Sequence, residues 1–161
     1  MLDLMSLLGG AVLSLPFEYI GDATGLTPDI ISGRVKAQGE IKNYSGYVLL
    51  KAKINLEAKV VCARCNTNFD TNSAFSIEQK LTDKLENKDN DEYILIENGV
   101  FDEAEFIKDS LILELPSRFL CNEDCMGLCP RCGKNLNKSP CSCDTKDIDP
   151  RLEVLSKYFE E

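Results

Sequence analysis

Cysteines are the residues of this chain whose type and spacing could do chemistry. Six of the eight cysteines lie between Cys121 and Cys143, and the chain contains no histidine. Thiolates at short spacing are typical ligands of structural metal sites. A chain without imidazole lacks the side chain most often used as a general base or proton shuttle near neutral pH. These residues therefore indicate a metal-stabilised binding protein rather than an enzyme.

The strongest local motif is Cys129–Gly133, which reads C-P-R-C-G. Two cysteines three positions apart can wrap one metal ion, and a glycine directly after the second permits a tight turn that aims backbone amides at the sulfurs. A C-S-C pair further on can complete the set, since residues two apart on an extended chain face the same way. We expect a closed structural zinc site, and the same thiolates would also suit an iron–sulfur cluster. The predicted ligands are Cys129, Cys132, Cys141 and Cys143.

The remaining cysteines predict a second site made of two pairs. Cys62 and Cys65 end a predicted strand, and Cys121 and Cys125 follow a predicted helix. A metal shared by both pairs would attach the C-terminal segment to the sheet. The division of ligands stays open, because another ligand in place of Cys125 fits the spacing almost as well. The sequence thus predicts one zinc ion and allows two.

Three other uses of the cysteines fit the sequence less well. Disulfides form in exported proteins, and the apolar N-terminus lacks the early positive charge of a signal peptide. A thioredoxin-like pair needs a C-x2-C motif at the start of a helix in a βαβ unit. Cys125, Cys129 and Cys132 match the cluster spacing of radical-SAM enzymes, but the chain is too short for the barrel those enzymes use. We therefore expect reduced, metal-bound thiols in a cytoplasmic protein.

The net charge of −9 is concentrated in one segment. Residues 81–116 carry 3 basic and 11 acidic side chains, a balance of −8, and the rest of the chain is nearly neutral. A solvated surface is the plainer interpretation of this acidity, and attraction of a basic partner is the functional one. Basic residues flank the thiols, and ordinary solubilising charge explains them most simply. The candidates among them for contact with RNA or a partner are Arg131, Lys134 and Lys138.

Alternation of apolar and polar residues indicates the sheet that must position the cysteines. From Val48 to Val60 every second residue is apolar, which predicts a long strand with one buried face. Asp102 is a suitable N-cap for a helix that runs to about residue 115 and stops before Pro116. A proline at position 150 favours a final helix over about 150–159. Other expected elements are strands at 12–20, 31–41, 69–81 and 93–96 and a loop at 86–92.

Together these elements predict an α+β protein with an antiparallel β-rich core, a packed helix, a cysteine-rich zinc knuckle segment and a C-terminal helix. The core domain is expected over residues 1–116, including the helix at about 102–115. Residues 117–161 are expected to form the zinc knuckle segment and the C-terminal helix, packed on the core. No stretch reaches the length of uninterrupted apolar sequence that a membrane helix needs.

Several motifs in order resemble the YceD family, which is named for large ribosomal RNA subunit accumulation. The matching segments are 61–65, 115–116, 124–137 and 149–155. The resemblance implies a bacterial or plastid cytoplasmic protein whose gene often neighbours that of a small zinc-ribbon protein of the large ribosomal subunit. It implies no known reaction and transfers no catalytic residues. Some family members lack the C-terminal cysteines, which implies that a metal stabilises this version of the fold rather than performing the family's task.

The function expected from these observations is that of a non-catalytic ribosome biogenesis factor. It would support accumulation of large-subunit rRNA by binding an assembly intermediate, through rRNA, a basic ribosomal protein or both. Neither a membrane nor a small-molecule substrate is expected as a partner. Two alternatives stay open: a zinc-ribbon nucleic-acid-binding protein, whose affinity for rRNA would be salt-sensitive, and a thiol-based redox regulator that would lose its metal on mild oxidation.

Overall fold

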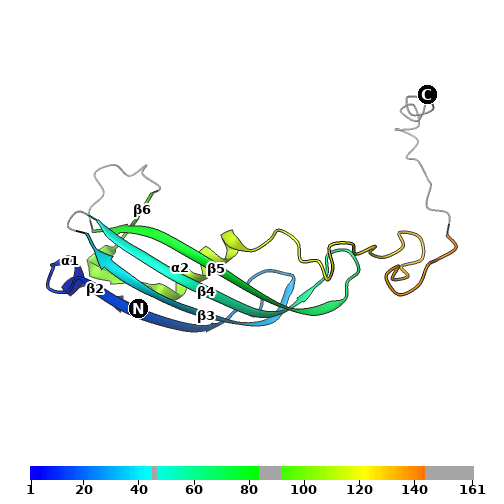
Figure 1. The fold of residues 1–161 in the computed structure, drawn as a ribbon, viewed down its shortest axis with the longest axis horizontal. Helices are drawn as coiled ribbons and strands as arrows, with labels where there is room; N and C mark the ends of the chain where they lie inside the picture. The colour runs from blue at the N-terminus through cyan, green and yellow to red at the C-terminus, as the bar shows by residue number, and fades with distance from the viewer. Residues whose placement is uncertain (45–46, 84–91, 144–161) are drawn as a thin grey trace, which may run out of the picture.

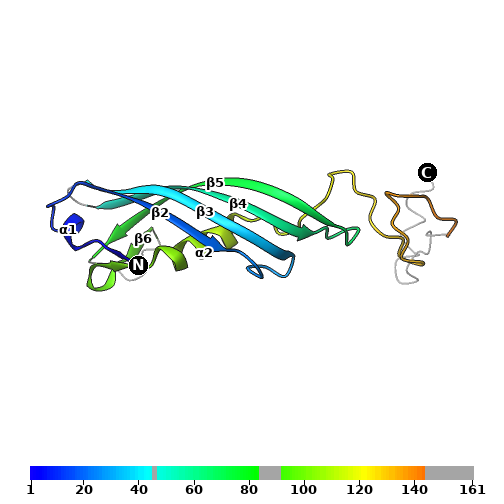
Figure 2. The ribbon, with the colours of Figure 1, turned by 90° about the horizontal axis from the view of Figure 1, so that it is seen from below.

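A long, twisted sheet dominates the molecule (Figures 1 and 2). The computed structural model describes residues 1–44, 47–83 and 92–143. Within these residues the sheet has the strand order β2-β3-β4-β5-β6, antiparallel from β2 to β5 and parallel between β5 and β6. Its strands are β2 (Ser14–Asp22), β3 (Ile30–Asn43), β4 (Val48–Val61), β5 (Asn68–Thr82) and β6 (Tyr93–Leu95).

The period-two pattern predicted for β4 is confirmed by its burial. Every second side chain from Val48 onward is buried, and Leu50 and Ile54 are completely enclosed. The strands expected at 12–20, 31–41 and 69–81 correspond to β2, β3 and β5. The long strands thus form the antiparallel β-rich core that the sequence predicts. Their alternation places apolar side chains on the buried face and polar side chains on the open one.

Among the described residues, the one long helix is α2 (Glu103–Glu114). It runs along one face of the sheet (Figure 2). It begins at the predicted N-cap, since the Asp102 carboxylate accepts hydrogen bonds from the backbone N–H groups of Ala104 (3.0 Å) and Glu105 (3.1 Å). Ile107 and Leu111 of α2 are fully buried, in the same apolar cluster as the inward side chains of β4. Helix and sheet thus contribute to one core.

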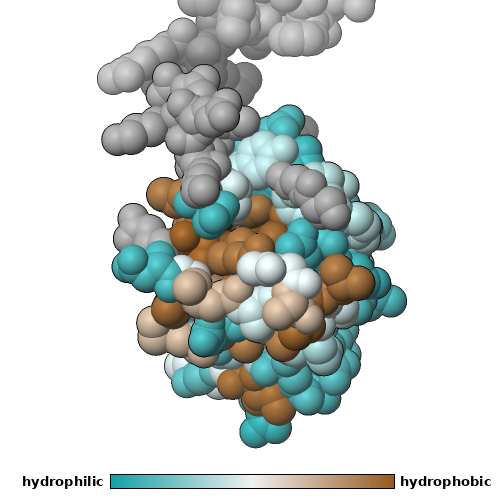
Figure 3. Space-filling view, turned by 90° about the vertical axis from the view of Figure 1, so that its left-hand side faces the viewer, coloured by the Kyte–Doolittle hydropathy of each residue, from teal (hydrophilic) through white to brown (hydrophobic). Residues whose placement is uncertain are grey.

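The apolar segment 2–8, which could form one or two helical turns before Gly9, has one turn and a short strand. Only α1 (Met5–Leu8) is helical, and β1 (Leu2–Asp3) instead pairs with β7 (Val100–Phe101), which follows the 3-10 turn η1 (Glu97–Gly99). Leu2 and Asp3 lie opposite Phe101 and Val100 in one short ladder, so these two residues find their backbone partners in a segment nearly 100 residues away. Apolar side chains gather at this end of the molecule, opposite the cysteines (Figure 3), and Met5 and Leu13 are exposed there.

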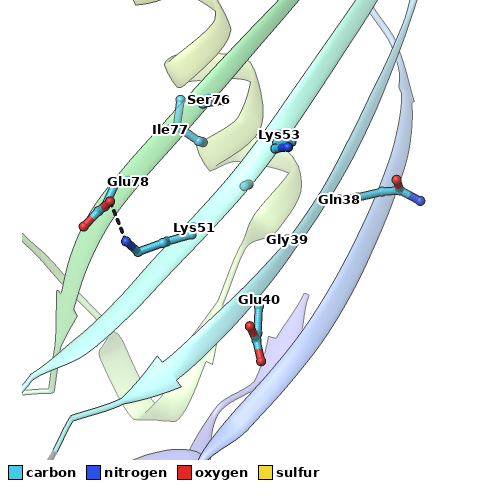
Figure 4. Close-up of a pocket in the computed structure, with 9 residues that line it drawn as sticks. Gln38, Gly39, Glu40, Lys51, Lys53, Ser76, Ile77 and Glu78 are labelled. Atoms are coloured by element: carbon cyan, nitrogen blue, oxygen red, sulfur yellow. Dashed lines mark ion pairs between the residues drawn. The ribbon is translucent and has the colours of Figure 1, made fainter.

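The other face of the sheet is polar and uncovered by any described helix. Charged side chains from neighbouring strands pair across it, as in Lys36 with Glu18 (2.9 Å) and Lys51 with Glu78 (2.9 Å). Figure 4 shows the Lys51–Glu78 pair beside a shallow depression over β3, β4 and β5. Exposed pairs of this kind contribute little to stability.

After α2 the chain runs past the β4–β5 end of the sheet and forms the cysteine-rich segment, yellow to orange in Figure 1. The expected C-terminal helix over 150–159 and nearly all of the expected loop at 86–92 lie outside the described residues. Within the part of the chain that is described, no helix has the length and apolar character needed to span a membrane.

Candidate metal centres

The first group of thiols joins the turn between β4 and β5 to the segment after α2. The sulfurs of its four residues lie within 4.8 Å of one another; these residues are Cys62, Cys65, Cys121 and Cys125. Two of the separations are 3.8 Å, between Cys62 and Cys125, and 3.6 Å, between Cys65 and Cys121. A disulfide needs about 2.05 Å, whereas four sulfurs placed tetrahedrally at about 2.3 Å from one zinc ion are about 3.8 Å apart. The spacing fits a shared metal ion rather than two disulfides.

A tight turn between β4 and β5 holds two of these thiols. The N–H of Asn66, whose φ is 55°, donates to the carbonyl of Cys62 (2.9 Å), and the N–H of Cys62 donates to the carbonyl of Thr67 (3.0 Å). Arg64, in the same turn, donates from Nη1 to the carbonyl of Cys125 (3.0 Å). The turn therefore positions Cys62 and Cys65, and its Arg64 side chain also binds the backbone of the segment that carries Cys121 and Cys125.

Backbone amides favour the thiolate form in this first group. Burial opposes ionisation of Cys62, yet the N–H groups of Cys121, Cys65 and Arg64 outweigh it and lower the Cys62 pKa to about 6. The hydrogen bond with Thr67 lowers the pKa of Cys65. By contrast, the hydrogen bond with the Cys65 sulfur, together with desolvation, raises the pKa of Cys121 to about 12. Crowded sulfurs compete for negative charge, and a cation among them would allow all four to ionise.

The second group of thiols is built on its own turn. The sulfurs of Cys129, Cys132, Cys141 and Cys143 lie within 4.8 Å of one another. Gly133 has a φ of +71° and donates its N–H to the carbonyl of Cys129 (2.9 Å), which is the tight turn predicted for this motif. The N–H groups of Cys132 and Arg131 lower the pKa of Cys129 to about 6. By contrast, the hydrogen bond of Cys143 with the Cys132 sulfur, together with desolvation, raises the pKa of Cys143 to about 12.

The structure thus brings together the two sets of four cysteines that the sequence suggested. Cys125 lies in the first group, beside Cys62, and not with Cys129, so the spacing shared with radical-SAM enzymes corresponds to no single thiol group among the described residues. Both groups are positioned to hold a metal ion. A four-thiolate set leaves no position for water or substrate, which suits a structural role.

The three basic candidates all lie in the loops around the second group. Arg131, Lys134 and Lys138 are exposed. The ammonium of Lys134 donates to the carbonyl of Pro140 (3.0 Å), so this side chain also closes the loop that leads to the last two thiols.

Sequence reasoning did not single out three polar residues that contact sulfur or position its neighbours. Asn137 donates to the Cys125 sulfur, Thr67 lies 3.3 Å from the Cys65 sulfur, and Asn135 contacts Thr67. The nearest signal was the pair of asparagines between the second and third cysteines of the second group, which reads only as a turn. These asparagines contact residues of the first thiol group, and no local sequence pattern indicates that contact.

Comparison with known proteins gives the following matches. Residues 50–158 match a family model described as "Large ribosomal RNA subunit accumulation protein YceD". A chloroplastic protein of Arabidopsis thaliana, named large ribosomal RNA subunit accumulation protein YCED homolog 1, is 38% identical over 60 residues, or 37% of this chain and 19% of that protein. Uncharacterized proteins of Mycobacterium bovis and Mycobacterium tuberculosis are 30% identical over 121 residues, or 71% of this chain.

The chain spans little more than half of the mycobacterial relatives, 57% of their length, and a smaller part of the plant protein. No solved structure matches it.

Proposed function

Because the family model covers residues 50–158, this chain belongs to the YceD family of large ribosomal RNA subunit accumulation proteins, and on that premise we propose that it is a non-catalytic ribosome biogenesis factor. It acts in the cytoplasm by binding an assembly intermediate of the large ribosomal subunit. The family membership carries the link to large-subunit rRNA accumulation. Charges and apolar groups on the core support direct binding.

In this proposal each thiol group holds one zinc ion that maintains the fold. Thiolate ligands favour zinc over magnesium, calcium or manganese, and a closed tetrahedral site has no room for a reacting molecule. The core of residues 1–116 then forms one domain, and residues 117–161 a second, zinc-dependent part. The sulfur separations of 3.6 and 3.8 Å support the first ion, and the gathering of four thiols supports the second.

A groove on the core supports binding of a basic protein segment. It is lined by residues of β6, β7 and the first two turns of α2 and has a volume of about 340 Å³. Its floor is apolar: the rings of Phe101 and Phe106 lie 5.4 Å apart, and Leu95 and Val100 are each about two-fifths exposed. Leu95 and Val100 thus offer apolar contact to a segment bound in the groove.

Carboxylates border this floor on the helix side. Asp102, Glu105 and Asp109 line the groove, and none of them forms an ion pair with another described residue. A segment with lysine or arginine next to apolar residues would match both the charge and the floor. Ribosomal proteins that bind rRNA need such basic segments. Occupying the groove would shield their charge before rRNA takes them over.

Charge reversal tests this proposal. Immobilised full-length protein, its E105K/D109K variant and an E57K/D70K control are mixed with purified large-subunit ribosomal proteins and, separately, with large-subunit rRNA at several salt concentrations. The control makes the same charge change on the open face of the sheet, where Glu57 and Asp70 lie on neighbouring strands.

Binding of basic proteins by the wild type and the control, and its loss in E105K/D109K, is the expected result. Equal binding by all three would refute the groove. Salt-sensitive binding of rRNA alone would instead favour the basic residues Arg131, Lys134 and Lys138 as the contact surface.

A further inference from the structure

The loop of the second thiol group reaches a sulfur of the first. Asn137, which lies between Cys132 and Cys141 in sequence, donates from its side-chain Nδ2 to the Cys125 sulfur at 3.2 Å. The orientation of this amide is fixed by chemistry, because its Oδ1 accepts the backbone N–H of Met126 at 2.8 Å. The nitrogen must therefore face the sulfur.

A second connection runs through Asn135 and Thr67. Asn135 Oδ1 accepts from the backbone N–H of Asn137 (3.0 Å), which turns its Nδ2 toward Thr67 Oγ1 (3.3 Å). Thr67 Oγ1 in turn lies 3.3 Å from the Cys65 sulfur. The Thr67 hydroxyl also donates to the Cys65 carbonyl (3.5 Å), so it contacts both the sulfur and the backbone of Cys65. Two sulfurs of the first group are thus supported from the loop of the second.

The second group holds this loop at both ends. Cys132 precedes the two asparagines and Cys141 follows them. Between these ends, the N–H of Cys129 donates to the carbonyl of Lys134 (2.8 Å), and the N–H of Leu136 donates to the carbonyl of Gly127 (3.0 Å). A metal ion at the second group would fix the loop ends and so keep both asparagine amides in place.

We propose that the two four-cysteine groups form one cooperative two-metal unit, in which the ion at the Cys129 group strengthens binding at the Cys62 group through Asn137. Asn137 is a positioning residue: it binds no metal but donates a hydrogen bond to a thiolate that does. Donation to a thiolate withdraws negative charge from a site that carries four of them and orients the sulfur. The inference rests on the metal occupancy proposed above and is independent of the ribosomal partner.

Loss of a hydrogen bond to a metal ligand lowers metal affinity by about 10- to 100-fold. Coupling is also reciprocal, because loss of the ion from either group weakens the other by the same factor. Wild-type protein is therefore expected to lose its two zinc ions over a narrower range of chelator concentration than N137A. An N137A variant should lose them in two steps, with the Cys62 group weakened by about 10- to 100-fold.

Variants of Asn137 separate its Oδ1 contact with Met126 from its Nδ2 contacts. N137D keeps the oxygen that accepts the Met126 N–H. It removes the Nδ2 donor to the Cys125 sulfur and to Asn135 Oδ1 (3.0 Å) and adds negative charge beside both. N72A, at a surface asparagine of β5, is the matched control. Zinc affinity is measured on the full chain by competition with a chromogenic chelator, and the visible spectrum of the Co²⁺-loaded protein reports on the thiolate ligands.

We expect N137D to bind no more tightly at the Cys62 group than N137A, and to alter the Co²⁺ spectrum. N72A should match the wild type. Restoration of wild-type affinity by N137D would overturn the inference, because the asparagine would then only shape the loop.

A double-mutant cycle tests the coupling itself. C141S/C143S disables the second group, and the first should then weaken about as much as in N137A. Adding N137A to C141S/C143S should cost little more, since the loop is already released. Additive losses would refute the coupling. Wild-type protein with fewer than two zinc ions would refute the metal proposal itself, whereas two ions with additive losses would refute only the cooperative unit.

Discussion

The first thiol group should stabilise the sheet by closing a long loop of the chain. Cys65 and Cys121 are 56 residues apart in sequence, and their sulfurs are 3.6 Å apart. The loop between them contains β5, β6, β7 and α2. A metal ion shared across this contact joins both ends of the loop in the folded protein, and it constrains the unfolded chain wherever it stays bound.

The cost of removing this link follows from loop-closure entropy. A cross-link that closes a loop of this length contributes about 4 kcal/mol in the chain-entropy treatment. For a protein of this size, that loss corresponds to a fall in Tm of about 8–16 °C. The C121S/C125S variant should therefore unfold at a clearly lower denaturant concentration than the wild type.

Far-UV circular dichroism during urea unfolding, with and without added zinc, measures this effect on the sheet. The matched control is C141S/C143S, whose thiols close only a local loop beyond the sheet. In that control, added zinc should still raise the midpoint through the intact first group, although less than in the wild type. In C121S/C125S, added zinc should leave the midpoint unchanged.

Two results would refute this reasoning. One is a midpoint for C121S/C125S equal to that of wild-type protein in zinc. The other is an equal response to zinc in both double variants, because the sheet would then be stabilised by something other than the first group.

Three further comparisons of variants have expected outcomes, each measured by urea unfolding of zinc-loaded protein. I54A removes a completely buried side chain of β4 and should cost about 2–5 kcal/mol, whereas K53A beside it, on the open face, should change stability by less than about 0.5 kcal/mol. G127A should cost more than G133A: both glycines have a φ above +70°, which costs other residues about 1–2 kcal/mol, but only at Gly127 would a Cβ also approach the Arg64 carbonyl, at 3.0 Å. D102A should lose about 1 kcal/mol with the N-cap of α2, and D102N should restore it, because asparagine caps equally well; equal losses in both would exclude capping as the cause.

The main strands and α2 were predictable because their signals are local. Alternation along β4 needs no knowledge of its neighbours, and the N-cap at Asp102 with Pro116 beyond the helix marks both ends of α2. The C-P-R-C-G motif likewise contains its own turn, so the second thiol group could be assembled from spacing alone.

Features that depend on distant pairing were not predictable. The ladder between β1 and β7 joins the N-terminus to residues 100–101, and no periodicity in a two-residue strand reveals it. The sequence left open another ligand in place of Cys125, because that spacing fits almost as well. In the structure the Cys125 sulfur lies 3.8 Å from the Cys62 sulfur, and its carbonyl accepts from Arg64. The contact of Asn137 with sulfur depends on that same arrangement of the two groups in space.

The first thiol group also lies at the tip of the β4–β5 hairpin, where it can decide how the two strands align. Val61 is opposite Asn68 and Val60 is opposite Phe69, so the turn begins at Cys62 and ends just after Cys65. Because β4 alternates so regularly, a slip of two residues would keep every apolar side chain on the same face and cost little in burial. Such a slip would carry Cys62 along one strand by two residues and separate it from Cys65. A metal ion at this tip therefore favours the native strand register over registers shifted by two residues, which differ little from it in hydrophobic burial.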